Sequence, residues 1–161
     1  MPLTVEDGTG LALADSYASR ADADTYHAAR GNAAWAAASA DARDAALRKA
    51  TQYLDTRYRW VGYRLTVAQA LEWPRSFVAK LGYPPGWPQP RVVHACIELA
   101  LRALSADLLA DEEGRDVLSE SVGPISVTYG PTGGGVRYPA ADLLVSPLTI
   151  GGRNSVRLDV A

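Results

Sequence analysis

The segment from Pro90 to Ala110 constrains the fold more strongly than any other part of the chain. Its polar side chains form one narrow stripe at helical spacing, and apolar side chains cover nearly all of the remaining circumference. The stripe consists of Arg91, His94, Glu98, Arg102 and Ser105. A helix that is apolar over most of its surface is enclosed by other elements on several sides. The segment therefore predicts a central helix of about 30 Å, at ~1.5 Å per residue, in a small helical bundle.

Capping residues predict two shorter helices that follow an extended N-terminal arm. Ser19 has the residue type of an N-cap, and the helix that it begins is expected to stop at Gly31. Asn32 is expected to cap a short second helix that buries Trp35.

A longer helix is predicted from Ser39 to Arg57. Its apolar residues recur at spacings of three and four, which places them on one face. Asp44 and Arg48 are four residues apart on the opposite face, and we expect them to form an ion pair there.

The C-terminal third of the chain has the pattern of strands. Apolar residues alternate at 125–129, and residues 136–138 are the expected partner in a β-hairpin that spans about 122–138. A short helix follows at 139–147. The expected fold is thus mainly α: one domain at 1–147, built around the helix at about 90–110, and an extended C-terminal tail at 148–161.

The overall charge argues against a protein that depends on phosphate binding. The chain has 16 Lys and Arg against 18 Asp and Glu, a formal net charge of −2. Proteins whose affinity rests on counterion release usually carry a basic excess. The sequence has neither a run of 18 apolar residues nor a charged-then-apolar leader, so we expect no membrane span and no signal peptide.

No arrangement of residues predicts catalysis or a cofactor. His27 and His94 are far apart, and no His, Cys or carboxylate spacing suits a metal ion. Cys96 falls among apolar residues of the central helix and is expected to be a core residue rather than a nucleophile. We therefore expect no enzyme activity, no metal and no cofactor.

Residues 55–75 interleave arginines with large aromatic residues. The arginines are Arg57, Arg59, Arg64 and Arg75, and the aromatic residues are Tyr58, Trp60, Tyr63 and Trp73. This combination is typical of nucleic-acid grooves, because guanidinium groups pair with phosphates and rings stack on bases. It is also typical of protein–protein hot spots. A third interpretation places the aromatic rings in the core, with the arginines lying over it.

The order of motifs along the chain resembles a phage protein family. The matching segments are residues 5–10 (VEDGTG), 16–17 (SY), 23–32 (ADTYHAARGN) with Trp35, 46–55 (ALRKATQYLD), 57–58 (RY), 69–75 (QALEWPR), 97–100 (IELA) and 122–125 (VGPI). Together they resemble the head–tail connector (adaptor) proteins of long-tailed phages, whose members are often labelled DnaT-like single-stranded-DNA-binding proteins. The resemblance covers about residues 1–147.

The resemblance implies a structural virion protein at the neck, present in the host cytoplasm during assembly. Its subunits would form a homo-oligomer, a dodecameric ring, between the portal protein and the next neck protein or tail terminator, and genomic double-stranded DNA would pass through without sequence-specific binding. A protein one layer further down the neck is a close variant of this hypothesis. Subunit or portal contacts would come from Arg57, Arg59, Trp60, Arg64, Trp73 and Arg75.

The C-terminal tail is the second expected contact with the portal. Its residues alternate like a strand that has no partner in its own domain, which suits strand addition to another protein. The residues expected to bind are Ile150, Arg153, Val156, Arg157, Leu158 and Val160. The label of the family implies the alternative function, a replication protein that binds single-stranded DNA through the aromatic–arginine segment.

Overall fold

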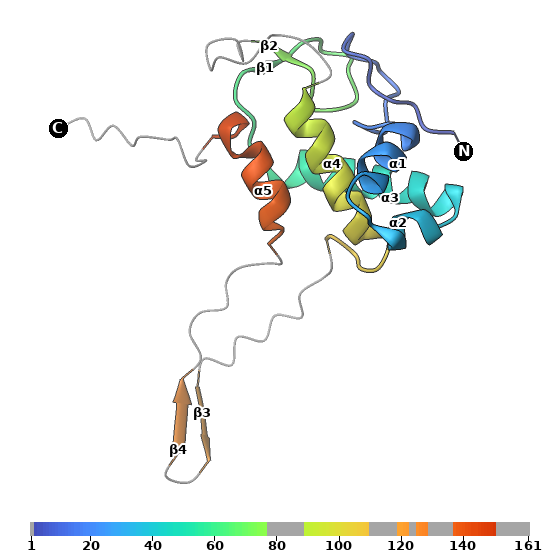
Figure 1. Ribbon diagram of the computed structural model, residues 1–161. Coiled ribbons are helices and arrows are strands. Elements are labelled where there is room, and N and C mark those ends of the chain that lie inside the picture. The colour runs from blue at the N-terminus through green and yellow to red at the C-terminus, as the bar shows by residue number, and fades with distance from the viewer. Residues whose placement is uncertain (1, 77–88, 110–118, 123–124, 129–136, 151–161) are drawn as a thin grey trace, which may run out of the picture.

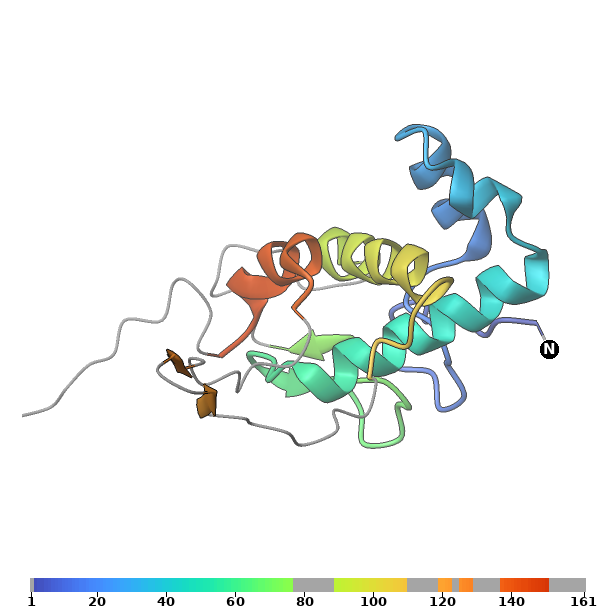
Figure 2. The ribbon, with the colours of Figure 1, turned by 90° about the horizontal axis from the view of Figure 1, so that it is seen from below.

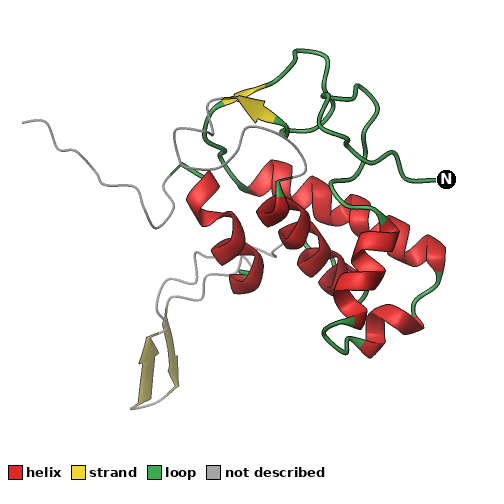
Figure 3. Cartoon of the chain, turned by 45° about the horizontal axis from the view of Figure 1, so that its top comes forward, coloured by secondary structure: helices red, strands yellow, loops and turns green. Residues whose placement is uncertain are grey.

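The computed structural model describes residues 2–76, 89–109, 119–122, 125–128 and 137–150 (Figure 1). Helices predominate, as predicted, and the short β1–β2 sheet lies with the long loops at one end of the helical body (Figure 3). In chain order the elements are α1 (Arg20–Ala28), α2 (Ala33–Ala37), α3 (Ala40–Arg57), β1 (Tyr63–Arg64), β2 (Arg75–Ser76), α4 (Pro90–Ala103), β3 (Ser119–Val122), β4 (Ile125–Thr128), α5 (Pro139–Val145) and a 3-10 turn, η2 (Ser146–Leu148).

Helix α4 is the centre of the fold. It packs along α3, and it lies between α1 on one flank and α5 on the other (Figures 1 and 2). Ile97 and Leu99 of α4 pack with Leu47 and Leu54 of α3, and all four side chains are at most 1% exposed. Burial of each such side chain stabilises the fold by roughly 1.5–3 kcal/mol. The prediction of an enclosed central helix is confirmed.

Helix α4 is shorter than predicted. Its 14 residues end at Ala103, so it spans about 21 Å rather than the expected 30 Å. The amides of Ser105 and Ala106 both bond to the carbonyl of Arg102, which closes the helix in a turn. Ser105 and Asp107 have lower helix propensity than the residues before them, and Leu108 reaches the core from the turn that follows.

The predicted caps of α1 and α3 are confirmed. Ser19 accepts a hydrogen bond from the amide of Asp22, and Ser39 accepts one from the amide of Ala42. Trp35 of α2 is 1% exposed, as expected, and its indole N–H donates to Asp24 at 2.7 Å. These helix starts follow from local sequence alone.

The prediction of an ion pair between Asp44 and Arg48 is wrong. Asp44 instead pairs with Arg20 at 3.2 Å, and Arg48 pairs with Asp15 at 2.6 Å. Both partners come from the N-terminal segment that folds back over α3. Tertiary contacts therefore replace the weak pairing of neighbouring turns.

The β-hairpin is present, but its pairing differs from the prediction. Strand β4 pairs antiparallel with the preceding strand β3, with Val122 opposite Ile125 and Ser119 opposite Thr128. Of the expected partner strand at 136–138, residues 137 and 138 are described and are not in a strand, because Tyr138 is the N-cap residue of α5. The expected tip, Gly130–Gly135, lies outside the described residues.

Residues 148–150 belong to the folded domain rather than to the tail. Leu148 is fully buried, and Thr149 forms an antiparallel bridge with Trp60. The amide of Ile150 donates to the carbonyl of Arg59 at 2.7 Å. These contacts attach residues 148–150 to the folded body, and residues 151–161 lie outside the described residues.

Candidate interaction surface

Arg75 organises the segment that follows α3. Its Nε donates to the carbonyl of Val61 at 3.0 Å, and one terminal nitrogen donates to the carbonyl of Gly62 at 2.6 Å. The other terminal nitrogen donates to the carbonyl and the carboxylate of Glu72, at 3.1 Å and 2.6 Å. The side chain is only 9% exposed. Arg75 thus joins both arms of the loop, and its burial does not fit the predicted role as a surface contact.

The two tryptophans of this segment are core residues. Trp73 is fully buried and Trp60 is 4% exposed, and their rings meet edge to face with centroids 5.7 Å apart. Neither indole nitrogen has a hydrogen-bond partner among the described residues. The rings stabilise the packing between α3, α5 and the loop. They are not placed to stack on bases, and they do not fit the predicted interface.

A buried polar network anchors the loop to α3. The Tyr17 hydroxyl donates to Asp55 and accepts from the amide of Trp73 at 3.1 Å, and Asp55 also accepts from the amide of Glu72 at 3.2 Å. Burial raises the pKa of Asp55 to about 6. Nothing in the spacing of these residues signals the network, because Tyr17 comes from the N-terminal arm.

Three arginines of the segment remain exposed. Arg57, Arg59 and Arg64 form no ion pair with any carboxylate in the described part of the chain. Arg64 donates to the carbonyl of Gln69. In contrast, Arg20, Arg43, Arg48, Arg75 and Arg102 are each paired with an acid. Their role in contacts with a partner stays a prediction.

Arg57 and Arg59 line a pocket of about 340 Å³ between the end of α3 and the end of α5. Ile150, which is 64% exposed, lies at the same pocket. Leu143 of α5 is a further exposed apolar residue, at 55%. Asp142 also lines this pocket, and we call the surface formed by Arg57, Arg59 and Ile150 the basic flank.

Two neighbouring loops, residues 8–14 and 63–67, expose large apolar side chains. Leu13 is 82% exposed, Tyr63 is 70% exposed, Leu65 is 49% exposed and Val67 is fully exposed. The loops touch, because the amide of Ala70 donates to the carbonyl of Leu11 at 3.0 Å (Figure 2). We call them the docking loops.

Gly10 permits this close approach of the docking loops. Its φ of +80° is a conformation that side chains rarely adopt. A Cβ atom at this position would lie 3.0 Å from the Oγ1 atom of Thr66. The contact between the two loops is therefore built into the sequence at this glycine.

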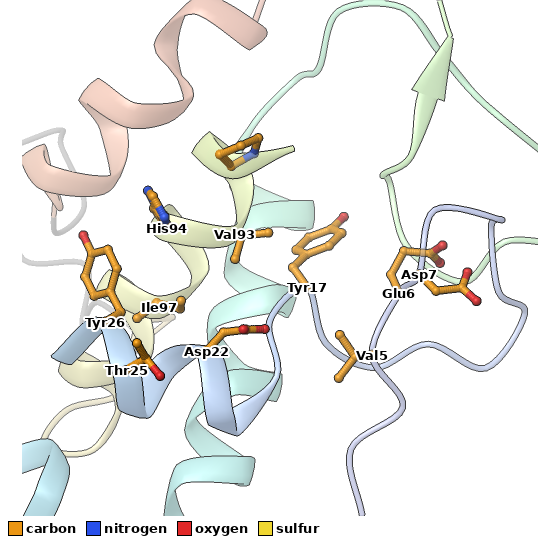
Figure 4. Close-up of a pocket in the computed structure, with 11 residues that line it drawn as sticks. Val5, Glu6, Asp7, Tyr17, Asp22, Thr25, Tyr26, Val93, His94 and Ile97 are labelled. Atoms are coloured by element: carbon orange, nitrogen blue, oxygen red, sulfur yellow. The ribbon is translucent and has the colours of Figure 1, made fainter. Parts of the chain in front are cut away.

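On the opposite flank of α4, a groove of about 500 Å³ lies between the N-terminal arm, α1 and α4 (Figure 4). Val5, Val93 and Ile97 give it an apolar floor, and Asp7 and Asp22 lie at its edges. Both aspartates are exposed and form no ion pair within the described residues. We call this site the acidic groove. Sequence patterns did not single it out, because its walls come from three separate segments.

Glu6 shapes the arm beside the acidic groove. Its carboxylate accepts hydrogen bonds from the amides of Gly8, Gly10 and Leu11 at 2.8–2.9 Å. The side chain is 2% exposed, and the three bonds satisfy a charge that burial would otherwise penalise. Glu6 therefore acts in the structure of the arm rather than as a contact residue.

Cys96 and His27 are buried residues of the described core. Within the described ranges, no group of three or more His, Cys, Asp or Glu could hold a metal ion. Cys96 is fully buried, and burial raises the pKa of its thiol to about 11. His27 is a buried structural residue between Ile97 and Asn32. In the same described part, no helix combines the length and apolarity needed to cross a membrane.

Of the predicted tail residues, only Ile150 lies in the described part of the chain. Its backbone bond to Arg59 attaches it to the domain, and its side chain is exposed. The others, Arg153, Val156, Arg157, Leu158 and Val160, lie outside the described residues, so their role stays a prediction.

A family model described as "Putative DnaT-like ssDNA binding protein" matches residues 1–161. No curated protein and no solved structure matches the chain. The match agrees with the DnaT-like part of the resemblance and carries no information on the adaptor part. It extends over the whole sequence, including the tail, and so the chain belongs to the family of putative DnaT-like ssDNA-binding proteins.

Proposed function

We propose that the protein is a structural assembly protein of the head–tail adaptor type, which acts through protein contacts rather than through bases. The observation that carries this proposal is the exposure pattern. The docking loops present Leu13, Tyr63, Leu65 and Val67 to solvent, whereas the tryptophans of the aromatic–arginine segment are buried. Clustered exposed apolar residues are typical of protein contacts. Stacking on the bases of a nucleic acid would instead require exposed tryptophan rings.

The partner in this proposal is the portal protein, as the resemblance to adaptors implies. The docking loops would bind the portal together with the C-terminal tail, and copies of the chain would associate side by side in a ring. Many modest contacts become strong when a ring closes, so no single surface needs high affinity.

Binding to the portal is tested by co-purification of the full chain with a portal protein, followed by electron microscopy of the complex. Leu65→Asp with Val67→Asp is expected to abolish co-purification while the thermal unfolding of the isolated protein stays unchanged. Lys49→Ala, at an exposed site on α3, is the matched control. Portal binding that survives the loop variant, or a complex in which the chain is absent from the portal–tail junction, would contradict the proposal.

The description of the family favours the second candidate function, the binding of single-stranded DNA. Three observations support it: Arg57, Arg59 and Arg64 are exposed, none pairs with a carboxylate in the described residues, and the ring of Tyr63 lies beside them in sequence. A groove of this kind would bind phosphates with strong dependence on salt. The net charge of −2 and the buried tryptophans argue for the first function.

Fluorescence anisotropy with a labelled oligonucleotide at two salt concentrations distinguishes the two functions. The first function predicts no saturable binding at low salt. The second predicts binding that weakens steeply with salt and is lost in the Arg59→Glu, Arg64→Glu variant. The Asp41→Asn variant, at an exposed acid on α3, serves as the control.

A further inference from the structure

We infer that the acidic groove of one copy binds the basic flank of a second copy, so that the chain associates head to tail. This inference rests on the proposed function, because it names the surfaces through which the assembly would form. It names the acidic groove, which the predicted interface does not include, as the partner surface of two arginines from that interface.

The first support is the distribution of charge that remains after internal pairing. The described ion pairs neutralise Asp15, Asp24, Asp44, Glu72 and Glu98 within the chain. The acids Asp7 and Asp22 remain at the groove, which His94 also lines, and the cations Arg57 and Arg59 remain at the opposite flank, which Asp142 also lines. Acids thus outnumber bases at the groove, and arginines outnumber acids at the flank.

The second support is the position of the two sites. The groove lies between the N-terminal arm, α1 and α4, and the basic flank lies where α3 meets the end of α5. Because α1 and α5 cover opposite flanks of α4, the two sites face away from each other (Figure 1). One copy can therefore not satisfy both sites internally. A contact between two different surfaces is heterologous, and it produces a ring if the rotation closes.

The third support is the match in apolar character. The groove has a floor of Val5, Val93 and Ile97 between its acidic edges (Figure 4). The basic flank carries exposed Ile150 beside its arginines. An apolar centre with charged residues at the rim is the usual anatomy of a protein interface. The charges would select the partner surface, and the apolar residues would supply the affinity.

The experiment uses the full chain and two neutralised variants. The first variant is Arg57→Ala with Arg59→Ala, which removes the charge of the basic flank. The second is Asp7→Asn with Asp22→Asn, which removes the aspartate charges of the groove but keeps side-chain oxygens that can accept the local hydrogen bonds from the Thr9 amide and the Ser19 hydroxyl. Lys49→Ala and Asp41→Asn are matched controls at exposed sites outside both surfaces. Thermal unfolding confirms that every variant is folded.

Sedimentation velocity over a concentration series provides the measurement. The wild-type protein and both controls are expected to self-associate, and each double variant is expected to associate at least about tenfold more weakly. An equimolar mixture of the two variants is expected to stop at a heterodimer. Each copy in that mixture keeps one intact surface, so one contact can form and no further copy can add.

Three results would overturn the inference: a wild-type protein that is monomeric at every concentration, a variant that associates as strongly as the wild type, or a mixture that stays monomeric. If the copies instead met through identical surfaces elsewhere on the chain, a variant would associate as strongly as the wild type. Co-purification with the portal separates this outcome from the proposed function. A chain that binds the portal but does not self-associate refutes only the inference, and one that self-associates without binding the portal refutes only the proposed function.

Discussion

Replacement of Arg75 by alanine separates a structural arginine from the contact arginines of the same segment. In the wild-type protein its guanidinium bonds to three carbonyls and to the carboxylate of Glu72, at 2.6–3.1 Å, with the side chain 9% exposed. Hydrogen bonds to charged groups contribute ~1.5–3 kcal/mol each, but they are not additive within one side chain. Loss of one partner of a buried pair costs roughly 3–5 kcal/mol.

The partial exposure of Glu72, at 34%, places the expected loss at the lower end of that range. We therefore expect Arg75→Ala to lower the free energy of unfolding by about 3 kcal/mol. Arg59→Ala, at an exposed site, should change it by less than about 0.5 kcal/mol. Arg75→Lys keeps the charge but cannot reach carbonyls on both arms of the loop, so it should recover only part of the loss.

Urea unfolding followed by tryptophan fluorescence measures all three variants, because Trp60 and Trp73 report directly on this region. The m-value should stay constant if the folded state is otherwise unchanged. A loss below about 1 kcal/mol for Arg75→Ala would refute the reasoning. It would mean that water satisfies the carbonyls of Val61 and Gly62, and that the segment is held by its tryptophans alone.

Three further variants test other parts of the structure. The pKa of Asp55 is about 6 in the folded protein, above its ordinary value of 3.8, so the folded state binds the proton more tightly than the unfolded state. The stability that this proton contributes should be full below about pH 4 and lost as pH rises through about 6. In urea unfolding, the free energy of unfolding of Asp55→Asn should therefore change less with pH over this range than that of the wild-type protein. Glu6→Gln cannot accept from all three amides of the arm, so it should cost roughly 1–3 kcal/mol and speed hydrogen exchange at Gly8, Gly10 and Leu11 while exchange in α4 stays slow. Trp35→Phe removes the bond to Asp24 and should destabilise by roughly 1–3 kcal/mol in thermal unfolding; an unchanged Tm would mean that Trp35 contributes only through its apolar surface.

The parts of the fold that were predicted correctly depend on signals within a few residues. Ser19 and Ser39 satisfy amides three positions ahead, so the starts of α1 and α3 are readable without any tertiary knowledge. The burial of α4 also follows from its own pattern. Apolar side chains cover most of its circumference, so a helix of this kind on the surface would expose apolar side chains to water in any orientation.

The errors arose where long-range contacts decided between similar local alternatives. Asp44 and Arg48 have suitable spacing for a pair, but the N-terminal segment offers each a better partner. Strand β4 could have paired with a segment on either side of it in the chain. Only two residues separate it from β3, so this pairing costs less chain entropy than the longer loop that was expected.

The candidate site was only partly predictable, for the same physical reason. Arg57, Arg59, Arg64 and Arg75 look alike in sequence, and only the reversal of the chain between β1 and β2 surrounds Arg75 with carbonyls. The acidic groove and the Tyr17–Asp55 network join residues from the arm to residues in distant helices. Composition can identify such residues as candidates, but it cannot determine which of them face solvent.

The distribution of charge therefore carries more information about function than the net charge. A net charge of −2 suggests a chain with little tendency to bind polyanions. Several of the acids and bases counted in that sum, however, are paired with each other inside the chain. The exposed remainder includes two local concentrations, arginines at the end of α3 and aspartates at the acidic groove, among scattered charges such as Asp41 and Lys49. A DNA-binding surface needs only the first of these sites. An assembly that repeats through one contact needs both the arginine site and the aspartate site, on opposite flanks of the same copy. The mixture of the two complementary variants tests this requirement directly, and it is therefore a stricter test than the loss of self-association in either variant alone.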